Sequence, residues 1–325
     1  MESQNNNIQP EKRKIRLYEH PWWSLLVIEV TYVVSNILAG VVIFGVMGLS
    51  GDSPVVVLAL LFTYHILTVF VFAHLVFHLP KGKSTFRQFL DDIGLTRVRP
   101  FFRIVLLTLS CYFILALLQV AASFVYRLSE GLPVTWSFVR QIIDISKILP
   151  PRDPSIYISL PSLFEEMAFR GILLTVFLSK YSERKAIIFS ALGFGLFHLP
   201  GLIAGQDPVW TLGQVIWSFI IGLFYGYVFV KTRSLLPSMV IHYLSNVFLS
   251  LLSGYMQARA SIEIQAFYGV ILSIGVVPTA LMILWTRFFS SKWLPVANDR
   301  GLTEVEATTP RLPVVYQTPI IEENK

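Results

Sequence analysis

Charged residues are scarce in this chain, and cysteine is almost absent. Asp, Glu, Lys and Arg make up 14% of the 325 residues and hydrophobic residues 54%, whereas an ordinary soluble domain is about 25% charged. The single cysteine, Cys111, excludes a disulfide framework and a thiolate metal site. We expect no cleavable signal sequence, because residues 1–20 are polar, mixed in charge and without an apolar core. This composition is typical of a polytopic membrane protein.

Basic residues outnumber acidic ones, which gives a net charge of +6 and a pI near 9.4. In a soluble protein this excess would suggest nucleic-acid binding, but here Lys and Arg cluster in loops beside apolar runs. Such clusters are orientation signals that stay on the cytoplasmic side. They predict that both termini are cytoplasmic. The expected partner is the lipid bilayer and not nucleic acid, and in a bacterium the location would be the cytoplasmic (inner) membrane.

Apolar runs recur along the whole chain. A membrane-spanning helix needs about 20 apolar residues, and several runs reach or approach that length. The fold class that they predict is all-α, a polytopic membrane helical bundle of about eight transmembrane helices. The predicted spans are 22–49, 55–79 (with His65, His74 and His78), 104–126, 155–178, 186–205, 209–230, 235–255 and 264–289.

The runs and the loops between them divide the chain into five segments. A polar cytoplasmic N-terminus is followed by three transmembrane helices with a basic cytoplasmic loop and an outer interfacial segment. A core of four transmembrane helices comes next, then a last transmembrane helix and a mobile cytoplasmic tail rich in proline. The boundaries of these segments are 1–20, 21–153, 154–255, 256–290 and 291–325.

The core begins with ionisable side chains inside an apolar run. Glu165, Glu166 and Arg170 lie there, although an ionised group at membrane depth costs roughly 2.5–3.5 kcal/mol on insertion scales. Such groups therefore mark a candidate functional site. Glu166 and Arg170 are four residues apart and are expected to pair on one helix face. Glu165 is rotated by about 100° and needs other partners.

Two later runs of the core offer those partners. Phe194 and His198 are four residues apart, and His242 and Asn246 belong to a polar stripe that recurs every fourth residue. Lipid offers no hydrogen-bond partner, so such a stripe faces the bundle interior or a water-filled cavity. We expect Glu165, His198, His242 and Asn246 to converge near the middle of the membrane.

A carboxylate beside imidazoles in a wet pocket can activate water. Glu165 with His198 would then serve as the general base, and imidazole and amide N–H groups would donate to an oxyanion. The alternative is a divalent metal such as zinc, held by Glu165, His198 and His242. Asn is a poor zinc ligand and the H-E-x-x-H pattern is missing. Water activation is the preferred interpretation, and the metal stays open.

Three motifs carry a resemblance to a known family. In this order and on separate apolar helices, they resemble the signature motifs of the CAAX-protease and bacteriocin-processing (abortive infection, CPBP) family of intramembrane proteases. The resemblance covers about 154–252 and implies that the core is an endopeptidase. It would hydrolyse a peptide bond of a membrane-associated or lipidated substrate, and the type member removes the last three residues of prenylated CAAX proteins. The motifs are Glu165-Glu166-x-x-x-Arg170, Phe194-x-x-x-His198 and His242-x-x-x-Asn246.

The resemblance also implies roles for single residues. Glu165 and His198 would position and activate the water, and His242 and Asn246 would stabilise the oxyanion. Site-supporting roles fall to Glu166, Arg170 and Phe194. The family has been called a metalloprotease by motif, so the cofactor is either none or a divalent metal. Bacterial members extend to peptide processing and bacteriocin immunity, so the peptide or protein substrate at the membrane need not be prenylated.

Two other classes of function use the same residues. A catalytically silent scaffold or bacteriocin-immunity protein of the same fold would use them only to hold helices together. Interhelical polar contacts average about 0.6 kcal/mol, which is a weak reason to bury three charges and two imidazoles. A transporter with a carboxylate proton relay would show two related halves with broken helices, which the sequence lacks. The enzyme is therefore the preferred hypothesis.

Overall fold

The computed structural model describes residues 17–49, 54–73, 86–129, 131–142, 144, 155–203, 205–256 and 275–294. Within these ranges the regular structure is helical and no β-strand occurs, which confirms the predicted all-α membrane bundle. Of the eight predicted spans, four form described helices that are long and apolar enough to cross a membrane. These are Pro21–Val46, Phe101–Val125, Glu183–Leu202 and Pro208–Thr232. Most of the predicted tail, 295–325, lies outside the described residues.

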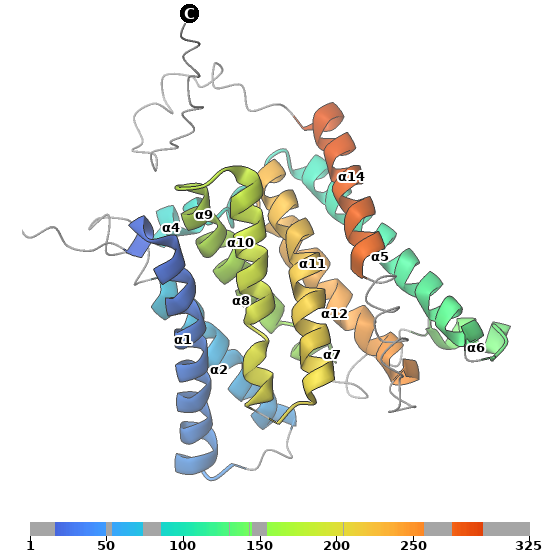
Figure 1. The fold of residues 1–325 in the computed structure, drawn as a ribbon, viewed down its shortest axis with the longest axis horizontal. Helices are drawn as coiled ribbons and strands as arrows, with labels where there is room; N and C mark the ends of the chain where they lie inside the picture. Colours follow the sequence, from blue (N-terminus) through green and yellow to red (C-terminus); the bar gives the residue numbers. More distant parts are fainter. Residues whose placement is uncertain are drawn as a thin grey trace, which may run out of the picture.

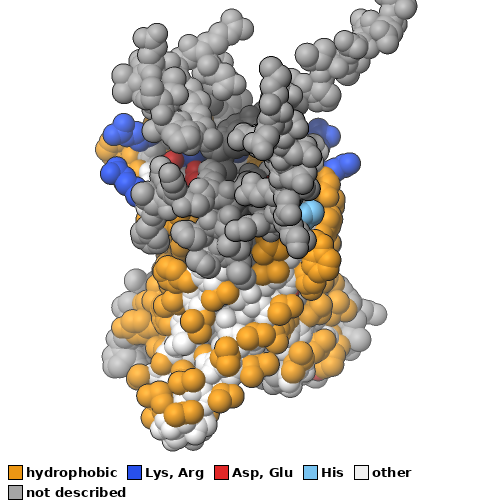
Figure 2. Space-filling model, turned by 90° about the vertical axis from the view of Figure 1, so that its left-hand side faces the viewer, with side chains coloured by type: hydrophobic (Ala, Val, Ile, Leu, Met, Phe, Trp, Pro, Cys, Tyr) orange, Lys and Arg blue, Asp and Glu red, His pale blue; other side chains and the backbone are white. Residues whose placement is uncertain are grey.

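The first two helices lie side by side at one edge of the bundle (Figure 1). α1 (Pro21–Gly40) continues into a π-helical segment, η2 (Val41–Val46), and packs along α2 (Pro54–Ala73). Proline begins both helices, at a position where its missing N–H costs no helical hydrogen bond. Figure 2 shows hydrophobic side chains over the lower part of this edge and Lys and Arg near its upper part. This distribution suits a surface that faces lipid below a polar boundary.

The run that carries the carboxylates lies in the middle of the bundle. α7 (Ser155–Ile158) is separated by a turn from α8 (Pro161–Glu166), which continues into the π-helical η5 (Met167–Leu173) and then α9 (Leu174–Leu178). The prediction of one helix over 155–178 is wrong at this turn, where Pro161 starts a new helix. Phe169, Leu173 and Phe177 are fully buried. The π-helical segment directly after Glu166 is typical of functional sites.

The second half of the core wraps around this run. α10 (Glu183–Leu196) ends in a short 3-10 helix, η6 (Leu199–Leu202), and packs along α11 (Pro208–Thr232). The side chain of Asp207 caps α11 by accepting a hydrogen bond from the Trp210 backbone N–H at 2.9 Å. α12 (Leu236–Met256) packs against α8 on one side and α11 on another.

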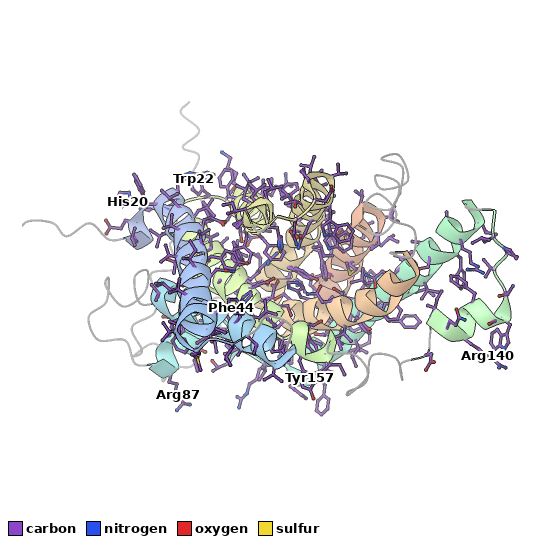
Figure 3. The ribbon with its side chains drawn as sticks, turned by 90° about the horizontal axis from the view of Figure 1, so that it is seen from below. His20, Trp22, Phe44, Arg87, Arg140 and Tyr157 are labelled. Carbon is purple, nitrogen blue, oxygen red and sulfur yellow. The ribbon has the colours of Figure 1, made fainter. Side chains whose placement is uncertain are left out.

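The remaining helices close the other edge of the bundle. α5 (Phe101–Ser129) packs against α12, and α14 (Val277–Trp293) packs against both α5 and α11. The short helices are α4 (Phe86–Asp92) and α6 (Trp136–Ile142). α6 lies at the end of α5, far from α1, and Figure 3 shows Arg140 at that extremity. Trp136 of α6 is 64% exposed.

Glycine allows α10 and α11 to lie close together. A Cβ atom at Gly195 would stand 2.8 Å from the backbone oxygen of Val215. The helices would have to separate, so we expect Gly195→Ala to destabilise the fold by about 1–3 kcal/mol. Thermal unfolding in detergent micelles measures this as a lower midpoint. Gly40→Ala is the control, because its Cβ would meet only Phe44 Cδ2 at 4.0 Å. Equal midpoints for the two variants would contradict the close approach.

Candidate active site

The site contains a fully buried ion pair. Arg170 Nη1 donates to Glu166 Oε1 at 2.9 Å, and both side chains are 0% exposed. The pairing predicted from their spacing is therefore present. The guanidinium carbon lies 4.1 Å from the ring centroid of Phe194 and 5.1 Å from that of Tyr225, where cation–π attraction offsets part of the desolvation cost. A Cβ at Gly222 would stand 3.0 Å from Arg170 Nη2, so this glycine makes room for the guanidinium.

His242, from α12, is bound to the same carboxylate. Its Nδ1 lies 2.9 Å from Glu166 Oε1, and because Glu166 is paired with Arg170 as a carboxylate, the imidazole must be the donor. The ring stacks on Tyr225 with centroids 5.1 Å apart, and Phe194 stands edge-on to it at 5.6 Å. The proton on Nδ1 leaves Nε2 of the neutral ring as a hydrogen-bond acceptor.

The carboxylate of Glu165 lies between two imidazoles. Its Oε2 is 3.8 Å from His242 Nε2, and its Oε1 is 3.2 Å from Nε2 of His65 on α2. The side chains of Glu165, His65 and His242 are 13%, 5% and 9% exposed. The side chain of Glu165 is thus largely enclosed by helices and keeps a small exposed fraction. The structure brings Glu165 and His242 together, as the sequence predicted.

His198 follows the end of α10 and is half-buried. Gln214 on α11 places its side-chain Nε2 3.2 Å from His198 Nδ1. An amide nitrogen donates, so His198 Nδ1 accepts and the ring carries its proton on Nε2. The Phe194 ring contacts both His198 and His242, with ring centroids 5.5 Å and 5.6 Å away. His198 therefore belongs to the same cluster as the carboxylate, without a direct hydrogen bond to it among the described contacts.

Asn246 is the predicted site residue whose contacts with the other site residues are fewest among those described. It stands one turn after His242 on α12 and is half-buried. In the described part of the chain, no hydrogen bond joins its amide to Glu165, His198 or His242. The two residues of this motif therefore share a helix face, and only His242 is tied into the network.

One segment of the chain matches a known protein family. Residues 155–248 match the family model described as type II CAAX prenyl endopeptidase Rce1-like. This segment is an Rce1-like domain. The match contains all three motifs and confirms the resemblance that they indicated. No curated protein matches the chain closely enough to count as a relative.

Two polar residues that contact the site were not predicted to do so. His65 lies on α2, outside the Rce1-like domain, and Gln214 lies within it on α11. The sequence carries a signal for each, because an ionisable or amide side chain interrupts an apolar run. Their partners are 100 and 16 residues away. Helix periodicity does not specify such pairings, since they depend on how the helices pack.

The metal hypothesis finds no support in the arrangement of these side chains. Across the described ranges, no three His, Cys, Asp or Glu residues are grouped so that they could hold a metal ion. Glu165, His198 and His242, the predicted ligands, are among the residues searched. His198 Nδ1 accepts a hydrogen bond from Gln214, so His198 Nε2 carries a proton and offers no lone pair to a metal. The Rce1-like domain therefore does not fit a metal centre built on these three ligands.

Proposed function

We propose that this protein is an intramembrane endopeptidase that hydrolyses a peptide bond of a membrane-associated substrate with a water molecule activated at Glu165. One observation carries the proposal. The Glu165 side chain keeps 13% exposure, and its two carboxylate oxygens face imidazole nitrogens of two other helices. The match of residues 155–248 to the type II CAAX prenyl endopeptidase Rce1-like family supports the same reaction class.

The geometry suits a water bound between Glu165 and His242. Their facing atoms, Oε2 and Nε2, are 3.8 Å apart, so one water can lie about 2.8 Å from both. The water gives a proton to Glu165 Oε2 while its oxygen bonds to the carbonyl carbon of the substrate. The same proton then passes to the amide nitrogen, the C–N bond breaks, the amine leaves, and Glu165 returns as a carboxylate.

The oxyanion of the tetrahedral intermediate needs hydrogen-bond donors. His198 carries a proton on Nε2 because its Nδ1 accepts from Gln214, so it is the first candidate. The Asn246 amide is the second. Neutral His242 has its proton on Nδ1, towards Glu166, which favours a role beside the water rather than at the oxyanion.

A lipidated substrate is the first class to test. The described helices form an apolar bundle, and a prenyl chain would hold a peptide at the depth of the site. The alternative of a silent scaffold or immunity protein would use the same contacts for packing alone. A carboxylate at position 165 would be a poor choice for packing alone, because its enclosure carries a desolvation cost that an apolar side chain avoids.

Cleavage of a defined peptide tests the proposal. The purified full chain in lipid nanodiscs is incubated with a farnesylated CAAX-type peptide and with its unlipidated twin, and the products are identified by mass spectrometry. We expect release of the last three residues from the farnesylated peptide. Cleavage of neither peptide by a folded protein would contradict the proposal.

Removal of metal ions by a chelator distinguishes activation of the water by a carboxylate from activation by a metal. We expect the rate of cleavage to stay within about twofold after dialysis against EDTA or addition of 1,10-phenanthroline, because the general base is a carboxylate. Loss of the activity in chelator and its return with zinc would contradict a glutamate-activated mechanism. His242→Ala is the inactive reference, since it removes the imidazole that faces the water.

A further inference from the structure

His65 contacts the carboxylate from outside the Rce1-like domain. It lies on α2, its side chain is 5% exposed, and its Nε2 is 3.2 Å from Glu165 Oε1. The other ring nitrogen, Nδ1, is 2.8 Å from the backbone oxygen of Leu61, one turn earlier on the same helix. Both nitrogens of this ring thus face an oxygen atom.

The hydrogen-bond partners of His65 determine which of its ring nitrogens carry a proton. A backbone carbonyl only accepts, so His65 Nδ1 carries a proton. A neutral ring would then present a lone pair from Nε2 to Glu165 Oε1, and a carboxylate oxygen also only accepts. Two acceptors 3.2 Å apart do not form a hydrogen bond. This contact therefore needs one more proton, held between His65 and Glu165.

The surroundings favour the imidazole as the holder of that proton. An ionised carboxylate enclosed at membrane depth needs a counter-charge. Arg170 is bonded to Glu166, and His242 Nε2 is farther from Glu165 than His65 Nε2 is, at 3.8 Å against 3.2 Å. A His65 ring protonated on both nitrogens supplies the charge at the shorter distance, through a charge-assisted hydrogen bond.

We propose that His65 is a positioning residue of this site, an inference that rests on the proposed peptide hydrolysis. It donates Nε2–H to Glu165 Oε1 and holds the carboxylate so that Oε2 faces His242 and the reacting water. His65 keeps its proton throughout, while the proton of the water travels by Oε2 to the leaving amine. The N-terminal helix pair is thereby part of the catalytic unit.

The ring itself is held by its neighbours. Tyr32 of α1 stands edge-on to His65 with centroids 6.0 Å apart, and Phe197 lies 6.4 Å from it. Tyr32 and Phe197 also contact each other, at 3.8 Å. With Leu61 fixing Nδ1, the imidazole has one orientation, which is what a positioning group requires.

Kinetics of His65 variants test this role. In the nanodisc assay with the farnesylated peptide, we expect His65→Leu to lower kcat by about 10²-fold with KM within twofold, because a misplaced base costs a rate of that order. His65→Gln keeps an N–H donor near Glu165 and should recover kcat to within about tenfold of the wild type. Thr63→Val on the same helix is the control, since the Thr63 hydroxyl bonds only Ala59 O at 2.6 Å among the described contacts. A wild-type kcat for His65→Leu, or equal losses for the Leu and Gln variants, would overturn the proposal.

A second measurement does not depend on activity. Solid-state ¹⁵N NMR of histidine-labelled protein distinguishes a ring protonated on both nitrogens from a neutral ring. We expect one such doubly protonated signal that disappears in both His65→Gln and Glu165→Gln. A wild-type spectrum without it would overturn the proposed hydrogen bond. If the signal is present and the wild type cleaves no peptide, the proposed function fails and the His65–Glu165 contact stands.

Discussion

Replacing Glu165 by Gln is expected to lower kcat for peptide cleavage by about 10²–10⁴-fold, the usual contribution of a positioned general base. Gln has the size of Glu but cannot take the proton of the water. Its fold should survive, because Glu165 is not part of the buried ion pair of Glu166 and Arg170. KM should change little, since the carboxylate acts on the water and not on the bound peptide.

The measurement compares initial rates of the wild type and the variant in nanodiscs, after circular dichroism has shown equal helix content. Glu183→Gln is the matched control. Glu183 is 41% exposed and contacts Lys231 at 3.5 Å, away from the site, so its loss should not affect kcat. If Glu165→Gln retained the wild-type kcat, water activation by this carboxylate would be excluded.

Replacing Arg170 by Met should cause the largest loss of stability. The change leaves the carboxylate of Glu166 at 0% exposure without its cation, and breaking a buried pair from one side typically costs about 3–5 kcal/mol. The cation–π contacts with Phe194 and Tyr225 disappear as well. His242 also loses the fixed orientation of its acceptor, so activity should fall together with stability.

Thermal unfolding in detergent micelles measures this loss as a lower midpoint. Arg97→Met is the control, because Arg97 contacts Asp91 at 3.4 Å with side chains 42% and 55% exposed, and exposed pairs contribute little. The double variant Glu166→Gln with Arg170→Met should recover part of the midpoint, since no lone charge stays buried. Equal midpoints for Arg170→Met and Arg97→Met would show that the buried pair does not stabilise the core.

The sequence was most informative where a pattern is local. Apolar runs predicted the helices, and the four-residue spacing predicted the bond between Glu166 and Arg170. The turn before Pro161 and the π-helical segment Met167–Leu173 were not predicted. Pro161 is a local signal for the turn that the apolar run concealed. The π-helical segment has no signal in the apolar periodicity.

The sequence predicted one partner of Glu165 but not the network around it. Burial of charge indicated that Glu165 needs partners, and the polar stripe of α12 offered His242, which the structure places beside it. That His242 also binds Glu166, 76 residues away, and that His65 binds Glu165, 100 residues away, follows from helix packing. Long-range pairings of this kind leave no trace in the spacing of residues along one helix.

The most direct measurement is an experimental structure of the wild-type protein with a non-hydrolysable analogue of the farnesylated peptide. A scissile carbonyl carbon about 3–3.5 Å from a water bound to Glu165 Oε2 is the predicted result, because reacting atoms must approach to that distance. An analogue bound elsewhere, with the Glu165 carboxylate closed off from it, would contradict hydrolysis at this site.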